Sequence, residues 1–155
     1  GNKANMCKNN SASTTSGLCV YAEGNKVYNT NTANYAVANH SDGTININGG
    51  TYYGGYVGIS NHQSGIVNIK NAKVESGMRP IVLFRASTTN ICNSNISYFT
   101  NDYVPEPWDL YVSSNVTTGV INYSSNVKFT GGTNTPVSGG VIANIVPNYT
   151  GTCTQ

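Results

Sequence analysis

Charged side chains are scarce in this chain. Only 9% of its 155 residues are Asp, Glu, Lys or Arg, and eight basic against six acidic residues leave a formal net charge of +2. Soluble domains usually carry about a quarter charged residues. So small a positive excess, with no basic cluster, gives no support for a nucleic-acid partner, because such partners are held through many phosphate contacts. Asn, Ser, Thr, Gly and Tyr are abundant instead, which suits contact with sugars or other uncharged polar surfaces.

Long apolar runs, leucine repeats and metal-binding motifs are also missing. No stretch approaches the roughly 18 apolar residues of a membrane-spanning helix, so no membrane insertion is expected. The chain has only three leucines, which excludes a leucine-rich repeat. It has no CxxC motif and no Cys/His pair at zinc spacing, so no metal site is predicted. No Gly-rich phosphate loop occurs and no cofactor is expected, and the GxSxG motif of serine hydrolases is also missing.

What the sequence does contain is one pattern written three times between Gly43 and Phe99, at a spacing of 22 residues. The apolar columns are Ile45, Val67 and Thr89; Ile47, Ile69 and Ile91; Tyr52, Val74 and Ile96; and Val37, Ile59 and Ile81. A polar column, Asn46, Asn68 and Asn90, separates the first two, and a turn column, Gly49, Asn71 and Asn93, follows them. The alternation predicts short strands with Asn facing outward. Gly and Asn predict sharp corners, because both reach the left-handed backbone region.

A period in the low twenties, built from short strands and turns, is typical of a solenoid. The sequence therefore predicts an all-β fold, a right-handed parallel β-helix of about six coils of roughly 22 residues spanning residues 18–146. Residues 1–17 are expected to form an N-terminal cap or linker, residues 139–146 a last alternating strand, and residues 147–155 a C-terminal tail. An immunoglobulin-like sandwich is the alternative, since it also has short, regularly spaced strands. Three aligned copies of the repeat favour the β-helix over the sandwich.

The repeat is interrupted once, after Ile96. Ile121 and Asn122 match Thr89 and Asn90 at a spacing of 32 in place of 22. About ten residues are therefore expected to have been added at one corner, within residues 99–110. Insertions in solenoids project from one face, which is often the binding face.

This insertion concentrates residues that are rare elsewhere in the chain: Asp102, Glu106 and Asp109, the sole Trp108, and Tyr103. Three explanations are open. The loop could be rigid, with Trp108 packed against the coil wall or a neighbouring subunit. Its aromatic rings could stack on sugars or a receptor while its carboxylates accept hydroxyl hydrogen bonds. Two of the acids could instead cleave a glycosidic bond as an acid and base pair.

Further candidates lie on the regular coils. Tyr53 is expected to face outward and is a second aromatic binding candidate. Arg79 and Arg85 could belong to a charged patch, although separately solvated side chains explain them as well. His40 and His62 lie 22 residues apart and should stack on adjacent coils. They could share a metal or lower one another's pKa, but a repeated corner is the preferred interpretation.

Four cysteines permit three pairings. Cys7 and Cys19 form the most local pair, and a disulfide between them would tether the N-terminal end. Cys92 occupies the outward position of Lys70 and could meet Cys153 if the C-terminal tail folds back, or remain a free thiol. Disulfides would indicate an oxidising compartment.

The segments GTININGGTYYGG, GIVNIKNAKVESG and STTNICNSNISYF resemble the rungs of right-handed parallel β-helix proteins of the pectate-lyase-like class. Bacteriophage tailspikes, fibre tips and secreted bacterial adhesins look most similar. The resemblance implies an extracellular, secreted or virion-surface protein, acting as a homotrimer or on a larger fibre. The clustered Asp, Arg and Lys residues of pectate lyases have no match here. Tailspikes that cleave polysaccharide use Asp and Glu, a role that only Asp102, Glu106 and Asp109 could take.

Three functions follow from these observations. The first is a receptor-binding or adhesive module that recognises a cell-surface glycan or polysaccharide. The second is a depolymerase domain, a glycoside hydrolase or lyase, that cuts such chains. The third is a structural shaft.

Overall fold

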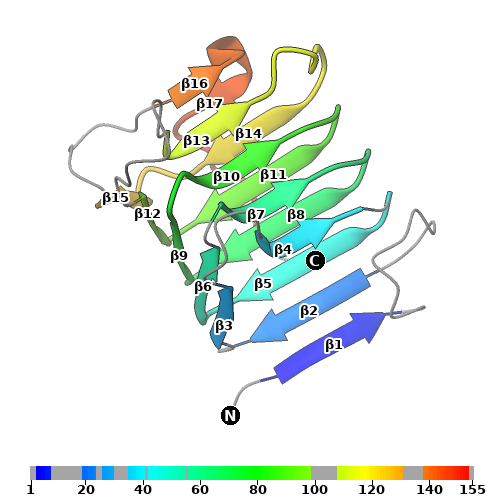
Figure 1. The fold of residues 1–155 in the computed structure, drawn as a ribbon, viewed down its shortest axis with the longest axis vertical. Coiled ribbons are helices and arrows are strands. Elements are labelled where there is room, and N and C mark those ends of the chain that lie inside the picture. Colours follow the sequence, from blue (N-terminus) through cyan, green and yellow to red (C-terminus); the bar gives the residue numbers. More distant parts are fainter. Residues whose placement is uncertain are drawn as a thin grey trace.

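The computed structural model of the chain describes residues 3–7, 19–23, 26–29, 35–40, 42–54, 56–98, 108–130 and 138–153, with the backbone only in the first three ranges. Its strands form three sheets (Figure 1). Sheet A runs in the order β1 (Lys3–Cys7), β2 (Cys19–Glu23), β5 (Thr44–Asn48), β8 (Ile66–Lys70), β11 (Thr88–Cys92), β14 (Val120–Tyr123) and β17 (Ile145–Val146). Sheet B runs in the order β15 (Lys128–Phe129), β12 (Asn95–Tyr98), β9 (Lys73–Ser76), β6 (Thr51–Gly54) and β3 (Lys26–Asn29). Sheet C runs in the order β16 (Ser138–Gly140), β13 (Leu110–Val112), β10 (Arg79–Leu83), β7 (Val57–Asn61) and β4 (Tyr35–Asn39).

The chain visits the three sheets in turn and so coils into a parallel β-helix, as the repeat predicts. Each coil adds one strand to sheet A, one to sheet B and one to sheet C, and successive coils lie one above another (Figure 1). Five such triplets are described, from β2–β3–β4 to β14–β15–β16, and β17 adds one more strand to sheet A. About four full turns separate the first triplet from the last, slightly fewer than the expected six coils. At the N-terminal end, β1 pairs antiparallel with β2 and places Cys7 opposite Cys19. A disulfide between these two residues stays a prediction.

The register of the strands confirms the predicted columns. Ile45 lies beside Val67, Val67 beside Thr89, and Thr89 beside Ile121. Side chains of these columns meet in one interior cluster, in which most Ile and Val residues are fully buried. Thr89 is accommodated there because Asn61 Nδ2 donates a hydrogen bond of 3.1 Å to its Oγ1. Each fully buried aliphatic side chain contributes about 1.5–3 kcal/mol to folding.

The corner between sheets A and B is built as the Gly/Asn column predicts. Gly49, Asn71 and Asn93 all have positive φ angles, of 78°, 56° and 43°. The two asparagines also hydrogen-bond from coil to coil. Asn71 Nδ2 donates to Asn48 Oδ1 at 3.2 Å, and Asn93 Nδ2 donates to Asn71 Oδ1 at 2.6 Å. Asparagine therefore stabilises this corner in two ways: its backbone adopts the positive φ angle, and its side-chain amide hydrogen-bonds to the next coil.

The outward column of sheet A forms a second asparagine ladder. Asn68 Nδ2 donates to Asn46 Oδ1, Asn90 Nδ2 to Asn68 Oδ1 and Asn122 Nδ2 to Asn90 Oδ1, each at 2.9 Å. Asn46, Asn68 and Asn90 are only 6%, 6% and 9% exposed. The ladder thus lies outside the interior cluster and is nevertheless shielded from water. Asn68 and Asn90, in the middle of the column, each donate one hydrogen bond to the coil before and accept one from the coil after.

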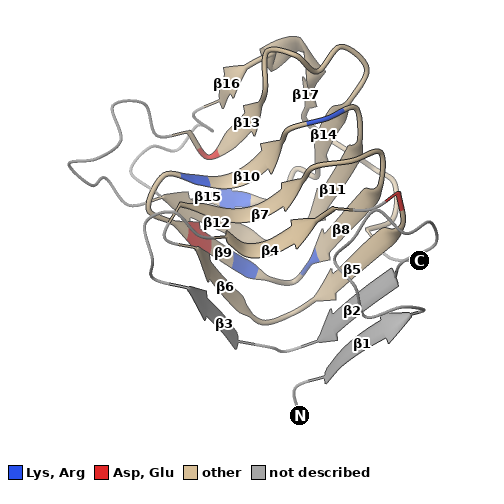
Figure 2. Cartoon of the chain, turned by 45° about the vertical axis from the view of Figure 1, so that its right-hand side comes forward, with Lys and Arg blue, Asp and Glu red and all other residues tan. Residues whose placement is uncertain are grey.

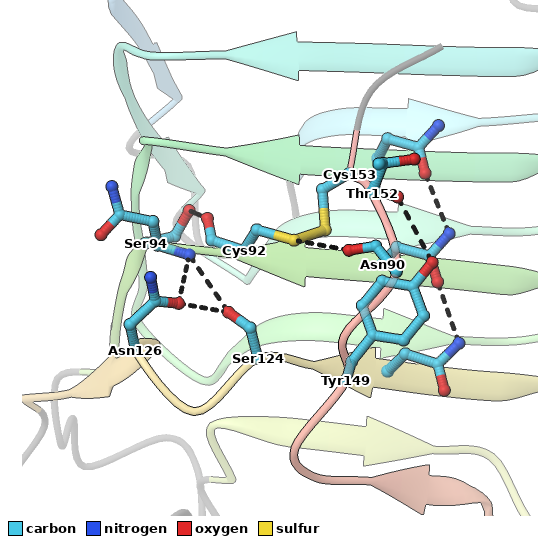
Figure 3. Close-up of a disulfide and its surroundings, with 12 residues drawn as sticks. Asn90, Cys92, Ser94, Ser124, Asn126, Tyr149, Thr152 and Cys153 are labelled. Carbon is cyan, nitrogen blue, oxygen red and sulfur yellow. Dashed lines mark hydrogen bonds between the residues drawn. A yellow bond between two sulfur atoms is a disulfide. The ribbon is translucent and has the colours of Figure 1, made fainter.

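Part of this shielding comes from the C-terminal tail. Tyr149 N donates to Tyr123 O at 2.9 Å, and a disulfide joins Cys153 to Cys92, whose Cα atoms are 5.8 Å apart. Figure 3 shows the segment from Tyr149 to Cys153 crossing the strands of sheet A next to Asn90. Of the two alternatives left open for Cys92, the structure therefore shows the disulfide with a folded-back tail and not the free thiol.

Two expectations about the later coils need correction. Leu110 pairs with Ile81 at an offset of 29, whereas Ile121 pairs with Thr89 at 32. The added residues are therefore not all at one corner: about seven precede β13 and about three follow it. The second corner is wider because Val116 turns inward and is buried, with its N–H donating to Ser113 O at 2.9 Å.

The second correction concerns residues 139–146, which do not form one alternating strand. They divide among the end of β16, the short 3-10 helix η1 (Ile142–Asn144) and β17. Gly140 has a φ of 73° at the end of β16, which turns the chain away from the strand direction.

We predict that Asn68→Ala lowers the free energy of unfolding by about 2–4 kcal/mol, because it leaves a buried acceptor on Asn46 and a buried donor on Asn90. Denaturant unfolding measures the loss. Asn95→Ala, at an exposed position of β12, is the matched control and should change stability by less than about 0.5 kcal/mol. Equal losses in the two variants would show that the ladder contributes nothing particular to stability.

Replacing Cys92 and Cys153 together by Ser should lower the free energy of unfolding by about 2–4 kcal/mol, because the disulfide restricts the unfolded chain. The tail should also become sensitive to protease in the native protein. Limited proteolysis followed by mass measurement would detect cleavage after Tyr149. A tail that stays protected without the disulfide would mean that the contacts near Tyr149 alone hold it in place.

Candidate functional site

A set of aromatic side chains lies on the outer side of sheet C. Leu110 and Val112 in β13 are fully buried in the interior cluster, so Tyr111 between them points outward. Contacts between the rings divide the set into two groups, and Arg79 belongs to the second. The members are Tyr35, His40, Tyr56, His62, Phe84, Trp108 and Tyr111, with Arg79, and each is half-buried. We call them the outer aromatic surface.

The first group contains a column that climbs three coils. His40 stacks on His62 with ring centroids 4.1 Å apart and an interplanar angle of 16°. His62 stacks in turn on Phe84 at 4.6 Å and 26°. The expected stacking of the two histidines is thus confirmed, and the near-parallel rings do not aim their nitrogens at a shared point. Phe84 lies 22 residues after His62, a signal that one further period would have revealed.

The environment of His62 keeps its imidazole neutral. Burial, the neighbouring His40 and Arg85 together lower the pKa of His62 to about 4. One ring nitrogen, Nε2, lies 2.8 Å from the hydroxyl of Ser60. Arg85 itself is exposed, and its Nη1 donates to the carbonyl of Phe84 at 3.2 Å. Arg85 therefore lies beside the column of His40, His62 and Phe84 and is not part of the ring stack.

Tyr35 packs edge-on against this column and extends the group sideways. Its ring centroid lies 5.3 Å from that of His62, 6.4 Å from that of Phe84 and 5.8 Å from that of Tyr56, all with steep interplanar angles. Burial and, less strongly, Tyr56 raise the pKa of Tyr35. The contact between Tyr35 and Tyr56 was not predicted, because it depends on how the rings turn over sheet C.

The second group joins Arg79, Trp108 and Tyr111. The Trp108 and Tyr111 rings are stacked, with centroids 5.1 Å apart and planes within 14°. The guanidinium carbon of Arg79 lies 4.7 Å from the Trp108 centroid and 3.8 Å from the Tyr111 centroid. Such contacts of a cation with aromatic faces contribute about 0.5–2 kcal/mol. Arg79 N also donates to Tyr56 O at 3.2 Å, which links this group to the first.

Glycine makes room for the indole. A Cβ atom at Gly139 would lie 2.3 Å from Trp108 Cδ2, so the ring rests directly on the backbone of β16. Tyr111 is the strand neighbour of Gly139 in β13. Trp108 is therefore packed against the coil wall, as the first explanation of the insertion supposed, while the ring stays half-exposed.

The remaining predicted site residues are distributed as follows. Asp102, Tyr103 and Glu106 lie outside the described residues. Asp109 is only 1% exposed, so its side chain is not offered to a polymer at the surface. Tyr53 lies on sheet B beside Glu75 and is not part of the outer aromatic surface. The structure thus brings Arg79 and Trp108 together, and their binding roles, like the catalytic role of the acids, stay predictions.

Charge contributes little to the described surface. Figure 2 shows isolated blue and red positions on an otherwise tan ribbon. In the parts that the structure describes, no three His, Cys, Asp or Glu side chains gather as a metal site would require. Over the same residues, no helix is long and apolar enough to cross a membrane. What this part of the chain offers for recognition is therefore aromatic faces, amides, hydroxyls and a few cations.

Comparisons with protein-family models, with curated proteins and with solved structures find no match to this chain.

Acid should destabilise the fold through His62. The pKa of His62 is about 4 in the folded chain and about 6.5 for an unperturbed imidazole, so the unfolded chain takes up the proton first. The stability that the neutral imidazole contributes is complete above about pH 6.5 and is lost as the pH falls toward 4. Unfolding free energies measured across this range, together with an NMR titration of the imidazole, test the effect.

His62→Phe is the matched variant for this test, because Phe84 already occupies the same column one coil later. It should flatten the pH dependence between pH 6.5 and 4. An unchanged slope in this variant would assign the acid sensitivity to other groups.

Proposed function

We propose that the chain is a glycan-binding module in which the outer aromatic surface contacts the sugar chain. The observation that carries this proposal is the row of half-buried aromatic rings along sheet C, flanked by Arg79. Sugar rings present apolar C–H faces that pack on aromatic rings, and their hydroxyls hydrogen-bond to guanidinium, amide and hydroxyl groups. The low charge of the chain favours a ligand that is rich in hydroxyl groups.

The dimensions of the surface suit an extended polymer. It reaches from β4 to β16, which are separated by four intervals in sheet C. With strands about 4.8 Å apart, the row is on the order of 20 Å long, enough for several sugar units. A short ligand would use only part of it.

The rings are also held in place before any ligand arrives. Tyr35 contacts three other rings, and Trp108 is fixed between Tyr111 and the backbone of Gly139. Side chains that are already ordered lose less conformational entropy on binding. The rigid aromatic row therefore loses little conformational entropy when it binds a ligand.

The biological setting that we propose is extracellular, secreted or virion-associated. The Cys92–Cys153 disulfide supports an oxidising environment. The resemblance of the rungs to tailspike, fibre-tip and adhesin β-helices supports a receptor-binding or adhesive role toward a cell-surface polysaccharide. A homotrimer or a larger fibre would multiply the contact through several copies of the same surface.

An array of purified bacterial capsular polysaccharides and O-antigen chains would test the proposal. Trp108→Ala and Tyr56→Ala should each lower the affinity for a bound glycan by at least about tenfold, because central aromatic anchors carry most of the binding energy in such contacts. Tyr53→Ala on sheet B is the matched control and should leave affinity unchanged. A loss confined to Tyr53→Ala, or binding that survives both surface variants, would overturn the proposed location.

The same incubations separate binding from cleavage. Products that remain full length on a sizing column support the binding module. Shortened chains that disappear with Asp102→Asn, Glu106→Gln or Asp109→Asn would replace it with a polysaccharide depolymerase. If the chain binds no polymer on the array, the remaining hypothesis is that it is a structural shaft.

A further inference from the structure

A polar groove of about 350 Å³ lies at the corner between sheets A and B. Its lining residues are Gly50, Asn71, Ala72, Lys73, Asn93, Asn95, Asn126 and Lys128. The groove belongs to the corner that the Asn71 and Asn93 turns build. None of its lining residues belongs to the outer aromatic surface.

Two of the asparagines that line this groove, Asn126 and Asn71, accept hydrogen bonds from other groups of the protein through their side-chain oxygens. Asn93 N donates to Asn126 Oδ1 at 3.1 Å, and since a backbone N–H can only donate, this contact fixes the oxygen of the Asn126 amide. The hydroxyl of Ser124 donates to the same oxygen. Figure 3 shows this oxygen at the meeting of two dashed lines, with the amide nitrogen on the other side of Asn126. Asn126 Nδ2 is thereby left for a ligand.

The two turn asparagines, Asn71 and Asn93, donate along the corner from coil to coil. Asn71 Oδ1 accepts from Asn93 Nδ2, and Asn48 Oδ1 accepts from Asn71 Nδ2. An Asn amide has two N–H bonds, and each nitrogen in this ladder uses one of them. The second N–H on both Asn71 and Asn93 remains for an acceptor. The corner therefore presents several amide N–H donors.

Two lysines add positive charge to these donors. Lys73, Asn95 and Lys128 are neighbours across β9, β12 and β15, so the two lysines lie two strands apart in one column, about 10 Å. The side chain of Lys73 is 53% exposed although it pairs with Glu75 at 2.5 Å, and Lys128 is exposed. The eight residues that line the groove include no acid.

We infer that this groove, which we call the Asn–Lys groove, binds the carboxylate or sulfate groups of an acidic polysaccharide. N–H donors and ammonium groups match an anionic oxygen ligand, since charge-assisted hydrogen bonds are the stronger kind. Anionic groups that recur along a polymer can meet both ends of the lysine column at once. The site is separate from the outer aromatic surface and does not depend on it.

Isothermal titration of the full chain with polygalacturonate, dextran sulfate and neutral dextran tests the inference. The two acidic polymers should bind, and neutral dextran should not bind in this groove. Lys73→Gln and Lys128→Gln should each weaken binding of the acidic polymers about tenfold, through loss of one hydrogen-bonded charge. Glu75→Gln should strengthen it, because the variant releases Lys73 from its partner carboxylate.

Lys70→Gln is the matched control, because it removes the same charge from the neighbouring strand β8 without touching the groove. It should weaken binding less than threefold at moderate salt, where separated exposed charges are screened. An equal loss in all three lysine variants would indicate diffuse attraction and overturn the site. Inorganic phosphate that binds as tightly as the polymers would show a small-anion site and overturn the polysaccharide assignment.

Two further readouts keep this test independent of the glycan-binding proposal. Thermal unfolding of each variant confirms that the Gln substitutions leave the fold intact. Trp108→Ala should not change binding of the acidic polymers. If acidic polymers bind but lose affinity only with Trp108→Ala, the ligand sits on the outer aromatic surface and the groove assignment fails while the proposed function stands.

Discussion

The structure depends on one constraint, the stacking of equivalent positions from coil to coil at the spacing of a parallel sheet. In the regular coils, a strand residue has its counterparts in the coils above and below as neighbours about 4.8 Å away. A residue type can repeat in a column only if it is compatible with itself. Ile47, Ile69 and Ile91 satisfy this rule by apolar contact. Asparagine satisfies it because one amide can donate upward and accept from below.

The same constraint accounts for the scarcity of charge. Like charges directly opposite one another in a sheet are destabilising, so a charged column cannot repeat. In the columns of sheet B, neutral neighbours separate the charged residues: Lys73 lies between Thr51 and Asn95, and Glu75 between Tyr53 and Ser97. The composition of the chain is thus a consequence of its architecture as much as of its surroundings.

Stacking also explains how far the sequence could predict the structure. The rungs were predictable because equivalent residues contact each other, so contacts across the fold appear as a period along the chain. The corner at Asn71 and Asn93 was predictable because few residues tolerate a positive φ. Phe84 could have been found by continuing the histidine column by one period.

Features that do not repeat were beyond this reasoning. The cluster of Arg79, Trp108 and Tyr111 joins separate coils around an insertion, and no period brings them together. The burial of the Asn90 column depends partly on a tail that comes from the end of the chain. The Asn–Lys groove depends on which way each amide faces, and that follows from hydrogen bonds made on the neighbouring coil.

The disulfide between Cys92 and Cys153 changes how the molecule would carry a mechanical load. Its two cysteines are 61 residues apart, and they connect β11 to the C-terminal tail. Tension applied between the two ends of the chain would pass from the first coils to Cys92 and then directly through the sulfur bridge to Cys153. The intervening coils lie within a covalent loop outside that path, and they include Trp108, Tyr111 and the Gly139 backbone on which the indole rests. A pull on the chain would therefore strain the early coils while this end of the outer aromatic surface kept its shape.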